Sequence, residues 1–331
     1  MGADNADEHG SLSQSTSFLE MEAAPHERRE NEVLVIGSRG SKLALWQANH
    51  VKARLEALGE ECRIEIIKTT GDLITHVPMK EVGSKGIFTK EIEEALMDGR
   101  IDLAVHSLKD LPTVLPGGLG ITSTPERQDV RDVLIGRTLA ELHTGARVGT
   151  GSLRRIAQLR AMRSDLLVEG IRGNVDTRIR KLDDGEYHAI VLAAAGLKRL
   201  GLADRIAEFI SIDSMCPAVG QGALAIETRL DGGAGMQASQ KLDDPATRAA
   251  ITAERAVLAR FGGGCEVPIG AYGSVAEHTL HLRAIVISPD GGRMVRDEIT
   301  GPSKEAFAIG TLMAEKLLAA GAGAILESVY E

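Results

Sequence analysis

The feature that most constrains the fold is a repeated order of apolar strand, glycine- or serine-containing loop and amphipathic helix. The order begins with EVLVIGSRGSKLALWQANHVKARLEAL, residues 32–58. A strand (CRIEIIKTT, 62–70), an amphipathic helix that ends at Gly99 and a buried strand (IDLAVHSLKDLP, 101–112) follow. This alternation of strands and helices predicts a mainly parallel sheet with helices on both faces.

The same order restarts after residue 128. ARVGTGSLRRIAQLRAMR (146–163) has the pattern of a strand, a loop and a helix, and the pattern recurs in 165–187 and 188–202. We therefore expect a second α/β domain of the same layout. CPAVGQGALAIETRL (216–230) predicts one more apolar strand after a proline- and glycine-rich crossing. We expect this strand to return to the first domain.

The C-terminal part of the chain has a different pattern. A helix is predicted over 245–260, then a glycine-rich loop, alternating strands within 278–300 that are joined by a PDGG turn, and a helix over 303–320. This order predicts a small α+β third domain. The expected division is a flexible tail at 1–30, a first domain of 31–127 with 223–242, a second of 128–222 and a third of 243–331.

The composition is that of a globular protein of two or three domains: 331 residues, of which 43% are hydrophobic and 26% charged. The net charge of −9 and the aromatic content of 3% argue against a nucleic-acid partner. No apolar run approaches the roughly 18 to 20 residues that cross a membrane. The first thirty residues also lack the basic start and apolar segment of a secretory signal. We expect a cytoplasmic protein that binds neither nucleic acid nor membrane.

The cysteines and histidines predict no metal site. Cys62, Cys216 and Cys265 form no C-x-x-C pair, which suits a reducing compartment, and His278 and His281 lack the H-E-x-x-H spacing. Cys265 stands out because it follows three glycines in RFGGGCEVPIGAYG. Both a packed thiol and an accessible one are compatible with this loop. Because no base stands beside it, an accessible thiol would be an attachment point rather than a nucleophile of the protease kind.

Cations and backbone donors follow nearly every strand of the two predicted α/β domains. Ligands of open parallel sheets bind beyond the carboxyl ends of the strands, and helix N-termini there favour anions. Singly, each arginine is best interpreted as an exposed charge, but five such loops at one edge favour a cleft for a ligand with several anionic groups. The residues are Ser38, Arg39, Ser41, Ser107, Lys109, Asp110, Thr150, Ser152, Arg154, Arg155, Arg172, Gly173, Asn174, Arg178, Lys198 and Arg199.

The type of anion follows from what the loops lack. No G-x-x-x-x-G-K-[ST] or G-x-G-x-x-G pattern follows a strand, so nucleotide-binding fingerprints are absent. Arginine grips carboxylates in a bidentate fork, which favours a polycarboxylate. Asp110 is a carboxylate among these cations. It is a helix or turn cap, a charge partner for a cationic intermediate, or a proton donor to a leaving amine. His106, in the same stretch, is interpreted as a core residue.

Seven motifs in order resemble those of the porphobilinogen deaminases (hydroxymethylbilane synthases) of tetrapyrrole biosynthesis. They are SRGSKLALWQA, DLAVHSLKDLP, VGTGSLRR, IRGNVDTR, LAAAGLKRLG, PAVGQGA and GGGCEVPIGAY. The likeness runs from about residue 33 to the C-terminus. It implies two doubly wound α/β domains like the halves of periplasmic binding proteins, with a small α+β third domain that carries Cys265. It also implies a monomer.

The resemblance implies a transferase with a dipyrromethane cofactor, bound by a thioether to Cys265. Four porphobilinogens are condensed onto this primer with loss of ammonia, and hydrolysis releases the linear tetrapyrrole. Each loss of ammonia leaves an azafulvenium cation, which Asp110 would stabilise as the catalytic residue. Since every pyrrole carries an acetate and a propionate, the arginines would bind carboxylates.

The resemblance also implies a role for each matching residue. Cofactor-binding residues are Ser107, Lys109, Asp110, Thr150, Ser152, Arg154, Arg155, Arg172 and Gly173. Substrate-binding residues are Arg39, Ser41, Arg172, Arg178, Arg199 and Gln221, and Lys85 and Phe88 belong to a loop over the active site. Glu81 stands where many relatives have lysine, with Lys80 adjacent. The alternative is a two-domain protein that binds a polycarboxylate without chemistry, which would leave Cys265 unexplained.

Overall fold

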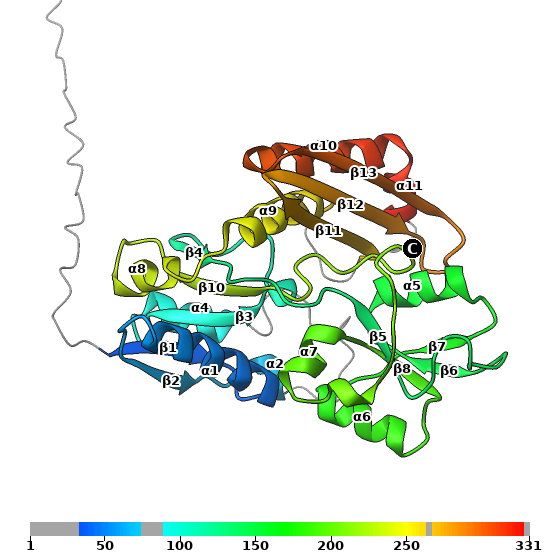
Figure 1. Ribbon diagram of the computed structural model, residues 1–331, viewed down its shortest axis with the longest axis horizontal. Helices are drawn as coiled ribbons and strands as arrows, with labels where there is room; N and C mark the ends of the chain where they lie inside the picture. The colour runs from blue at the N-terminus through cyan, green and yellow to red at the C-terminus, as the bar shows by residue number, and fades with distance from the viewer. Residues whose placement is uncertain (1–32, 74–88, 263–266, 328–331) are drawn as a thin grey trace, which may run out of the picture.

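The computed structural model describes residues 33–73, 89–262 and 267–327. Three sheets organise this part of the chain, each with its own helices, and Figure 1 shows the first two side by side with the third above them. The first two sheets are α/β and the third is α+β, so the predicted fold class is confirmed.

The first sheet has the strand order β2-β1-β3-β10-β4. Its strands are β1 (Leu34–Ser38), β2 (Cys62–Ile66), β3 (Leu103–Ser107), β4 (Leu119–Ser123) and β10 (Leu224–Arg229). Its helices are α1 (Lys42–Glu56), α2 (Thr70–Leu73), α4 (Lys90–Met97) and α8 (Ala234–Gln240), with the short turn η1 (Leu108–Asp110) after β3. β1 is parallel to β2 and β3, whereas β10 is antiparallel to β3 and β4. The expected return of the chain to the first sheet is therefore confirmed, in the antiparallel sense.

The second sheet repeats this plan with the order β7-β6-β8-β5-β9. Its strands are β5 (Asp132–Ile135), β6 (Arg147–Gly149), β7 (Leu167–Glu169), β8 (Ala189–Ala193) and β9 (Ile206–Phe209). Its helices are α5 (Leu153–Met162), α6 (Val175–Asp183) and α7 (Ala194–Arg199), with the turn η2 (Ala203–Arg205). Here β5 is the antiparallel member, paired with β8 and β9. Each sheet thus has one reversed strand beside its edge strand, where the chain leaves or re-enters the domain.

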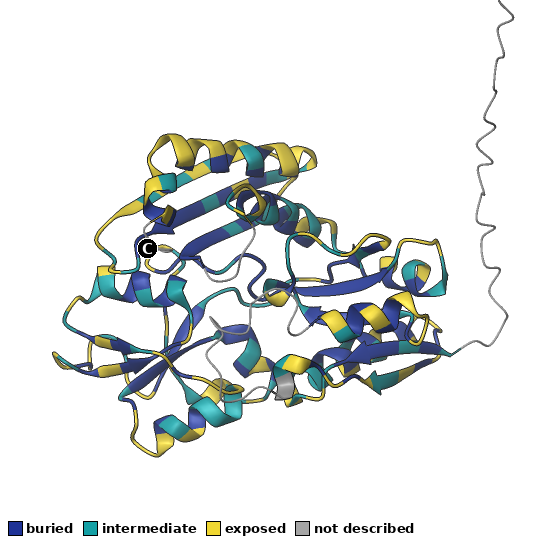
Figure 2. Cartoon of the chain, turned by 180° about the vertical axis from the view of Figure 1, so that it is seen from behind, coloured by how far each residue is buried: buried dark blue, intermediate teal, exposed yellow. Residues whose placement is uncertain are grey.

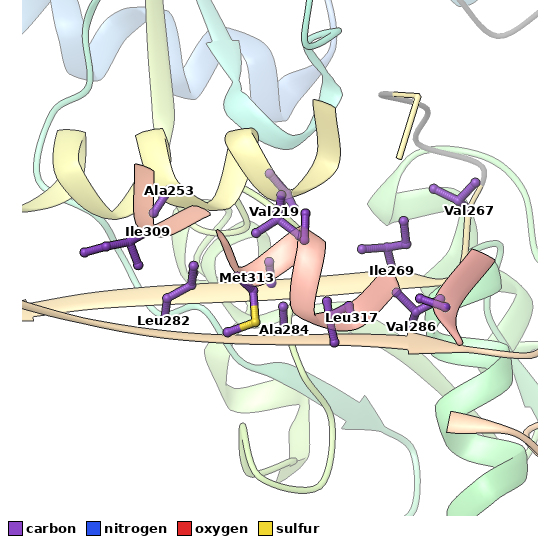
Figure 3. Close-up of a cluster of buried hydrophobic side chains, with 14 of the residues drawn as sticks. Val219, Ala253, Val267, Ile269, Leu282, Ala284, Val286, Ile309, Met313 and Leu317 are labelled. Atoms are coloured by element: carbon purple, nitrogen blue, oxygen red, sulfur yellow. The ribbon is translucent and has the colours of Figure 1, made fainter. Parts of the chain in front are cut away.

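The third sheet is antiparallel, in the order β11-β12-β13. Its strands are β11 (Ile269–Ala276), β12 (Thr279–Ile287) and β13 (Met294–Pro302), and its helices are α9 (Pro245–Arg260), α10 (Ala306–Ala319) and α11 (Ala322–Glu327), with η3 (Ser303–Glu305) before α10. Figure 3 shows Met313 and Leu317 of α10 beside Leu282 and Ala284 of β12. These side chains are almost fully buried, and α9 contributes Ala253 to the same core. Figure 2 shows that the outer face of α10 is exposed; β11 and β12 are largely buried, whereas the edge strand β13 is intermediate to exposed along its length.

The chain crosses between the first two sheets twice, before β5 and after β9. The crossings touch: the N–H of Gln128 donates to the carbonyl of Gly222 at 3.2 Å. Gly222 has φ of +86°, and a Cβ there would lie 2.5 Å from the carbonyl oxygen of Gln128. Glycine is therefore required at this contact. The boundaries 31–127 with 223–242, 128–222 and 243–331 stay a prediction, which the membership of the strands in the three sheets supports.

The third domain packs against both of the others. The carbonyl of Pro289 accepts a hydrogen bond from Arg160 of α5 at 2.9 Å, and Arg248 of α9 donates to the carbonyl of Thr122 at 2.7 Å. The first two domains also touch each other, because α1 contacts α7. In addition, Nζ of Lys42 on α1 lies 2.8 Å from Oδ2 of Asp176 on α6. These contacts join each of the three domains to the other two.

Candidate active site

One small pocket collects side chains from the ends of β1 and β3. Its volume is about 60 Å³, and it is lined by Arg39, Ser41, His106, Ser107 and Asp110 together with Gln47 and Thr89. Ser41 is the N-cap of α1, since its hydroxyl accepts a hydrogen bond from the N–H of Ala44 at 3.2 Å. The hydroxyl of Ser107 accepts one from Gln47 at 2.8 Å. The structure therefore brings four of the predicted site residues together: Arg39, Ser41, Ser107 and Asp110.

The turn η1 presents Lys109 and Asp110 at the end of β3. Leu108 is buried and anchors the turn, whereas Asp110 is exposed and Lys109 partly buried. Gly220 of the second crossing packs on this anchor: it has φ of +73°, and a Cβ there would lie 2.2 Å from the Leu108 side chain. Burial lowers the pKa of Lys109 to about 8, although the negative charge of Asp110 opposes the shift. This lysine is thus a cation that can lose its charge within the neutral to mildly basic range.

Arg154 and Arg155 lie in the first turn of α5, and both are buried. From the sequence, both were expected in the loop that follows β6. The helix begins earlier, at Leu153, and both side chains are on its buried face. Both are paired with Asp132, which is fully buried at the start of β5: Arg154 Nη1 is 2.8 Å from its Oδ2 and Arg155 Nη2 is 2.7 Å from its Oδ1. Burial alone would raise the pKa of Asp132, but the two guanidiniums outweigh it and hold that pKa far below its usual range.

The loop before α6 supplies another cation that faces the same region. Gly173 has φ of +106°, and its carbonyl accepts a hydrogen bond from Nε of Arg178 at 2.7 Å. Burial lowers the pKa of Arg178 to about 10, with Arg155 adding to the shift and Asp110 opposing it. Arg178 of the second domain is therefore close enough to Asp110 of the first to interact with it electrostatically. Arg172 and Gly173 are exposed on the same loop.

Thr150 and Ser152 shape the loop between β6 and α5. Thr150 is fully buried, its N–H donates to the carbonyl of Glu169 at 2.9 Å, and its hydroxyl accepts from the N–H of Ser152 at 3.4 Å. Ser152 occupies the N-cap position of α5 without a capping side-chain hydrogen bond. The hydroxyl of Thr150 therefore helps to hold the conformation of this loop.

Arg199 and Gln221 are engaged within the chain. Arg199 is buried on α7, donates to Oε1 of Gln128 and the carbonyl of Gly222 at 2.8 Å each, and has its pKa lowered to about 10 by burial. Gln221 is fully buried and donates to Oδ1 of Asp132 at 2.9 Å. These contacts tie the second domain to the crossings, and the role of both residues in substrate binding stays a prediction.

Cys265, Lys85 and Phe88, together with Lys80 and Glu81, lie outside the described residues, so their assignments stay predictions. The other two cysteines are buried. Burial raises the pKa of Cys62 to about 11 and that of Cys216 to about 12, which makes both thiols poor nucleophiles at neutral pH.

Sequence reasoning missed two buried carboxylates that organise the site. Asp132 is one, and Glu254 of α9 is the other: it pairs with Arg127 through both oxygens, at 2.5 and 3.1 Å, and accepts from the N–H groups of Gly220 and Gly273 at 2.7 Å each. Glu254 thereby joins both crossings to the third domain. In the sequence, each of these carboxylates is the single acidic residue of a largely apolar run, which could have indicated a buried acid. The runs are VRDVLIG for Asp132 and AAITAERAVLA for Glu254.

The electrostatic balance of the site is positive. Among the described residues, Lys109 interacts electrostatically with Arg154, Arg155, Asp110 and Asp132, and Arg178 interacts with Arg155 and Asp110. Four cations here thus share the carboxylates of Asp110 and Asp132. Within the described ranges there is no cluster of three or more His, Cys, Asp or Glu side chains that could hold a metal ion. None of the helices in this part of the chain is long and apolar enough to cross a membrane. The cation excess fits a ligand with several carboxylates.

Comparisons with known proteins identify the family of this chain. Residues 34–235 match the family described as "Porphobilinogen deaminase, dipyromethane cofactor binding domain", and residues 248–319 match "Porphobilinogen deaminase, C-terminal domain". The porphobilinogen deaminase of Trichlorobacter lovleyi is 52% identical over 302 residues, which is 90% of this chain and 97% of that protein. That of Geobacter metallireducens is 51% identical over 90% of this chain and 95% of its own length.

Likenesses among solved structures are weaker. A periplasmic substrate-binding protein of an ABC transporter from Coxiella burnetii has a TM-score of 0.41 at 14% identity, covering 66% of this chain and 94% of that one. These values say nothing about the ligand of this chain. The two family matches cover most of the chain, and the curated relatives are about half identical to it. The chain therefore belongs to the porphobilinogen deaminase family.

Proposed function

We propose that this chain is a transferase that condenses four molecules of porphobilinogen head to tail, with release of ammonia, and then hydrolytically releases hydroxymethylbilane. The observation that carries the proposal is the cation cluster around Asp110, contributed by both α/β domains. Each pyrrole of substrate and product bears two carboxylates, and a positive cleft with one exposed carboxylate suits such molecules. A protein that only binds a polycarboxylate would need no Asp110 among the cations.

The described residues fit the dipyrromethane group of this family. Its carboxylates require several cations at one place, and Lys109, Arg154, Arg155 and Arg178 supply an excess of positive charge there. In addition, Nε of Arg154 is buried and has no hydrogen-bond partner among the residues that the structure describes. When bound, through a thioether to Cys265, the group supplies the free pyrrole carbon to which the first substrate is joined.

The chain's own residues have separable roles in the condensation. Arg39 and Ser41 at the pocket mouth bind and orient the incoming pyrrole, with Arg172, Arg178, Arg199 and Gln221 on the opposite domain. The carboxylate of Asp110 stabilises the positive charge that develops on the substrate as the C–N bond breaks. Ser107, Lys109, Thr150, Ser152, Arg154, Arg155 and Gly173 hold the carboxylates of the primer, and Lys85 and Phe88 cover the site.

Mass spectrometry and kinetics test the proposal together. Under denaturing conditions the wild-type chain should exceed its sequence mass by two linked pyrroles, and Cys265→Ala should lack this excess. Cys62→Ala is the matched control, because that thiol is buried beside α1, and it should keep the full excess. Asp110→Asn should keep the excess yet lose at least about 100-fold in kcat, the usual contribution of such a charge partner. An unmodified wild-type chain that forms hydroxymethylbilane at a normal rate would refute the attachment, and near-normal turnover of Asp110→Asn would refute its role.

We further propose that the chain acts as a cytoplasmic monomer without nucleic-acid partners. The net charge of −9 supports the absence of nucleic acid, since phosphate binding requires a positive surface. Sedimentation equilibrium should give the mass of one chain, 35.2 kDa plus the cofactor, at micromolar concentration.

A further inference from the structure

Three ionisable side chains are buried together beneath the active-site pocket. His106 on β3, Glu227 on β10 and Glu93 on α4 have exposed fractions of 6%, 0% and 9%. Nε2 of His106 lies 3.1 Å from Oε2 of Glu227. The two residues face α4 from diagonal positions of neighbouring antiparallel strands, since His106 pairs with Ala225 and Glu227 with Ala104. Figure 1 shows α4 beside these strands.

Among the described residues, the imidazole is the only group paired with the Glu227 carboxylate. The 3.1 Å contact is an ion-pair distance without hydrogen-bond geometry, since Nε2 of His106 and both oxygens of Glu227 have no hydrogen-bond partner in this part of the chain. Burying a carboxylate without donors costs several kcal/mol, and the positive charge of a protonated His106 would compensate it. Burial raises the pKa of Glu93, the hydroxyl of Thr89 opposes this, and the charge of Glu227 adds to it. Burial therefore favours the protonated, neutral form of Glu93, which lies within electrostatic range of both Glu227 and His106.

His106 connects this buried trio to the active site. It lines the pocket of about 60 Å³ that Asp110, Ser107 and Arg39 also line. The charged and titratable groups around the imidazole are thus Glu227 from β10, Glu93 from α4, Arg39 after β1, and Lys109 and Asp110 that continue its own strand. Because Nε2 faces Glu227, Nδ1 is the ring nitrogen that remains for a second proton-transfer partner.

We propose that His106, held by Glu227, takes up the proton that each condensation releases in this pocket. The inference rests on the proposed function and deepens it. Each condensation breaks the C–N bond of the aminomethyl group and forms a C–C bond to a pyrrole carbon, and that carbon then loses its proton. Nδ1 of neutral His106 accepts the proton, Glu227 stabilises the imidazolium through Nε2–H, and the proton passes to the departing ammonia, which leaves as ammonium. Asp110 keeps its separate role as the partner of the positive charge.

Glutamine substitutions with pH-rate profiles test the arrangement. Glu227→Gln removes the charge behind the imidazole, so the imidazolium is less stable and the pKa of the imidazole falls. The acidic limb of the kcat profile should therefore move to lower pH, kcat should fall at least about tenfold, and KM should change little. His106→Gln should lose about 100-fold or more in kcat. Glu93→Gln keeps a neutral group in place and should leave the limb where it is.

Ser239→Ala is the matched control for damage to the first domain. Ser239 is fully buried and lies 2.7 Å from the hydroxyl of Thr122, away from the pocket, so its loss removes a buried hydrogen bond without touching the trio. This variant should lower the thermal midpoint yet keep the wild-type pH profile. If His106→Gln does not fold, the pH-rate profile of Glu227→Gln still tests the proposal, because the imidazole is present in that variant.

Proton NMR of the imidazole gives a readout that needs no turnover. The ring signal absent from His106→Gln identifies His106, and its titration should lie at lower pH in Glu227→Gln than in the wild type. Equal imidazole titrations and equal acidic limbs in the two proteins would overturn the proposal, as would near-normal kcat in a folded His106→Gln. A wild-type chain that does not consume porphobilinogen would refute the proposed function instead, and the NMR comparison would still report on the pair.

Discussion

Replacement of Asp132 by asparagine tests the most consequential buried contact of the second domain. Asp132 is fully buried and neutralises Arg154 and Arg155, whose side chains are only 3% and 5% exposed. Asparagine has nearly the same shape but no charge, so the variant leaves two guanidiniums buried side by side without a counterion. Removing one partner of a buried ion pair costs about 3 to 5 kcal/mol.

The expected readout is the midpoint of thermal unfolding, followed by circular dichroism and calorimetry. A loss of about 3 to 5 kcal/mol corresponds to a drop of about 6 to 20 °C for a cooperative unit of about 150 to 250 residues, and to a larger drop if the second domain unfolds alone. Because the pKa of Asp132 is lowered in the folded state, its contribution is present above the unfolded value of about 3.9 and is lost as the pH falls below it. The difference between the two proteins should accordingly shrink in acid.

Asp165→Asn is the control, since Asp165 makes the same kind of two-point pair with Arg163 at the surface. Solvent screens that pair, and the midpoint should hardly move. The reasoning would be refuted if Asp132→Asn melted within about 2 °C of the wild type, because the buried guanidiniums would then need no counterion.

Three further predictions concern the crossings and the pocket. Glu254→Gln should separate the unfolding of the third domain from that of the other two, visible as a split calorimetric transition; one unchanged transition would contradict this. Gly222→Ala should cost about 1 to 3 kcal/mol, because the added Cβ would meet the carbonyl of Gln128 at positive φ, and it should exceed the cost of Gly185→Ala, where φ is +80° but nothing lies within 4 Å. The kcat should fall above pH 8 as Lys109, which holds the primer, loses its charge, and Lys109→Arg should abolish the fall; the same fall in both proteins would assign it to another group.

Much of the fold could be predicted because its signals are local. The 3.6-residue periodicity of α1 and the alternation in β12 and β13 each depend on residues close in sequence. The PDGG turn lies between β12 and β13 as expected, and α9 has the predicted bounds, Pro245–Arg260. His106 is buried, in accord with its interpretation as a core residue.

The internal contacts of the site could not be predicted from local pattern. The arginines of GSLRR were recognised as important, yet their partner Asp132 stands more than twenty residues earlier and is joined to them only when β5 pairs with β8. Likewise, nothing near Glu254 in the sequence indicates Arg127, which is 127 residues away. Arg199 has the residue type of a ligand-binding group, but its hydrogen bonds to Gln128 and Gly222 depend on where the two crossings meet. Such partners are set by topology, which periodicity does not encode.

The antiparallel position of β10 has a consequence for the order of assembly. Because β10 is hydrogen-bonded between β3 and β4, the first sheet cannot be completed until residue 229 has left the ribosome, whereas the strands of the second sheet all lie between residues 132 and 209. Synthesis therefore delivers a whole second domain while the first still has a gap in its sheet, with β4 unpaired to its neighbour. In a nascent chain, the first domain therefore completes its sheet after the second has been made, about a hundred residues of synthesis after its own β4, and its incomplete sheet is exposed during that interval.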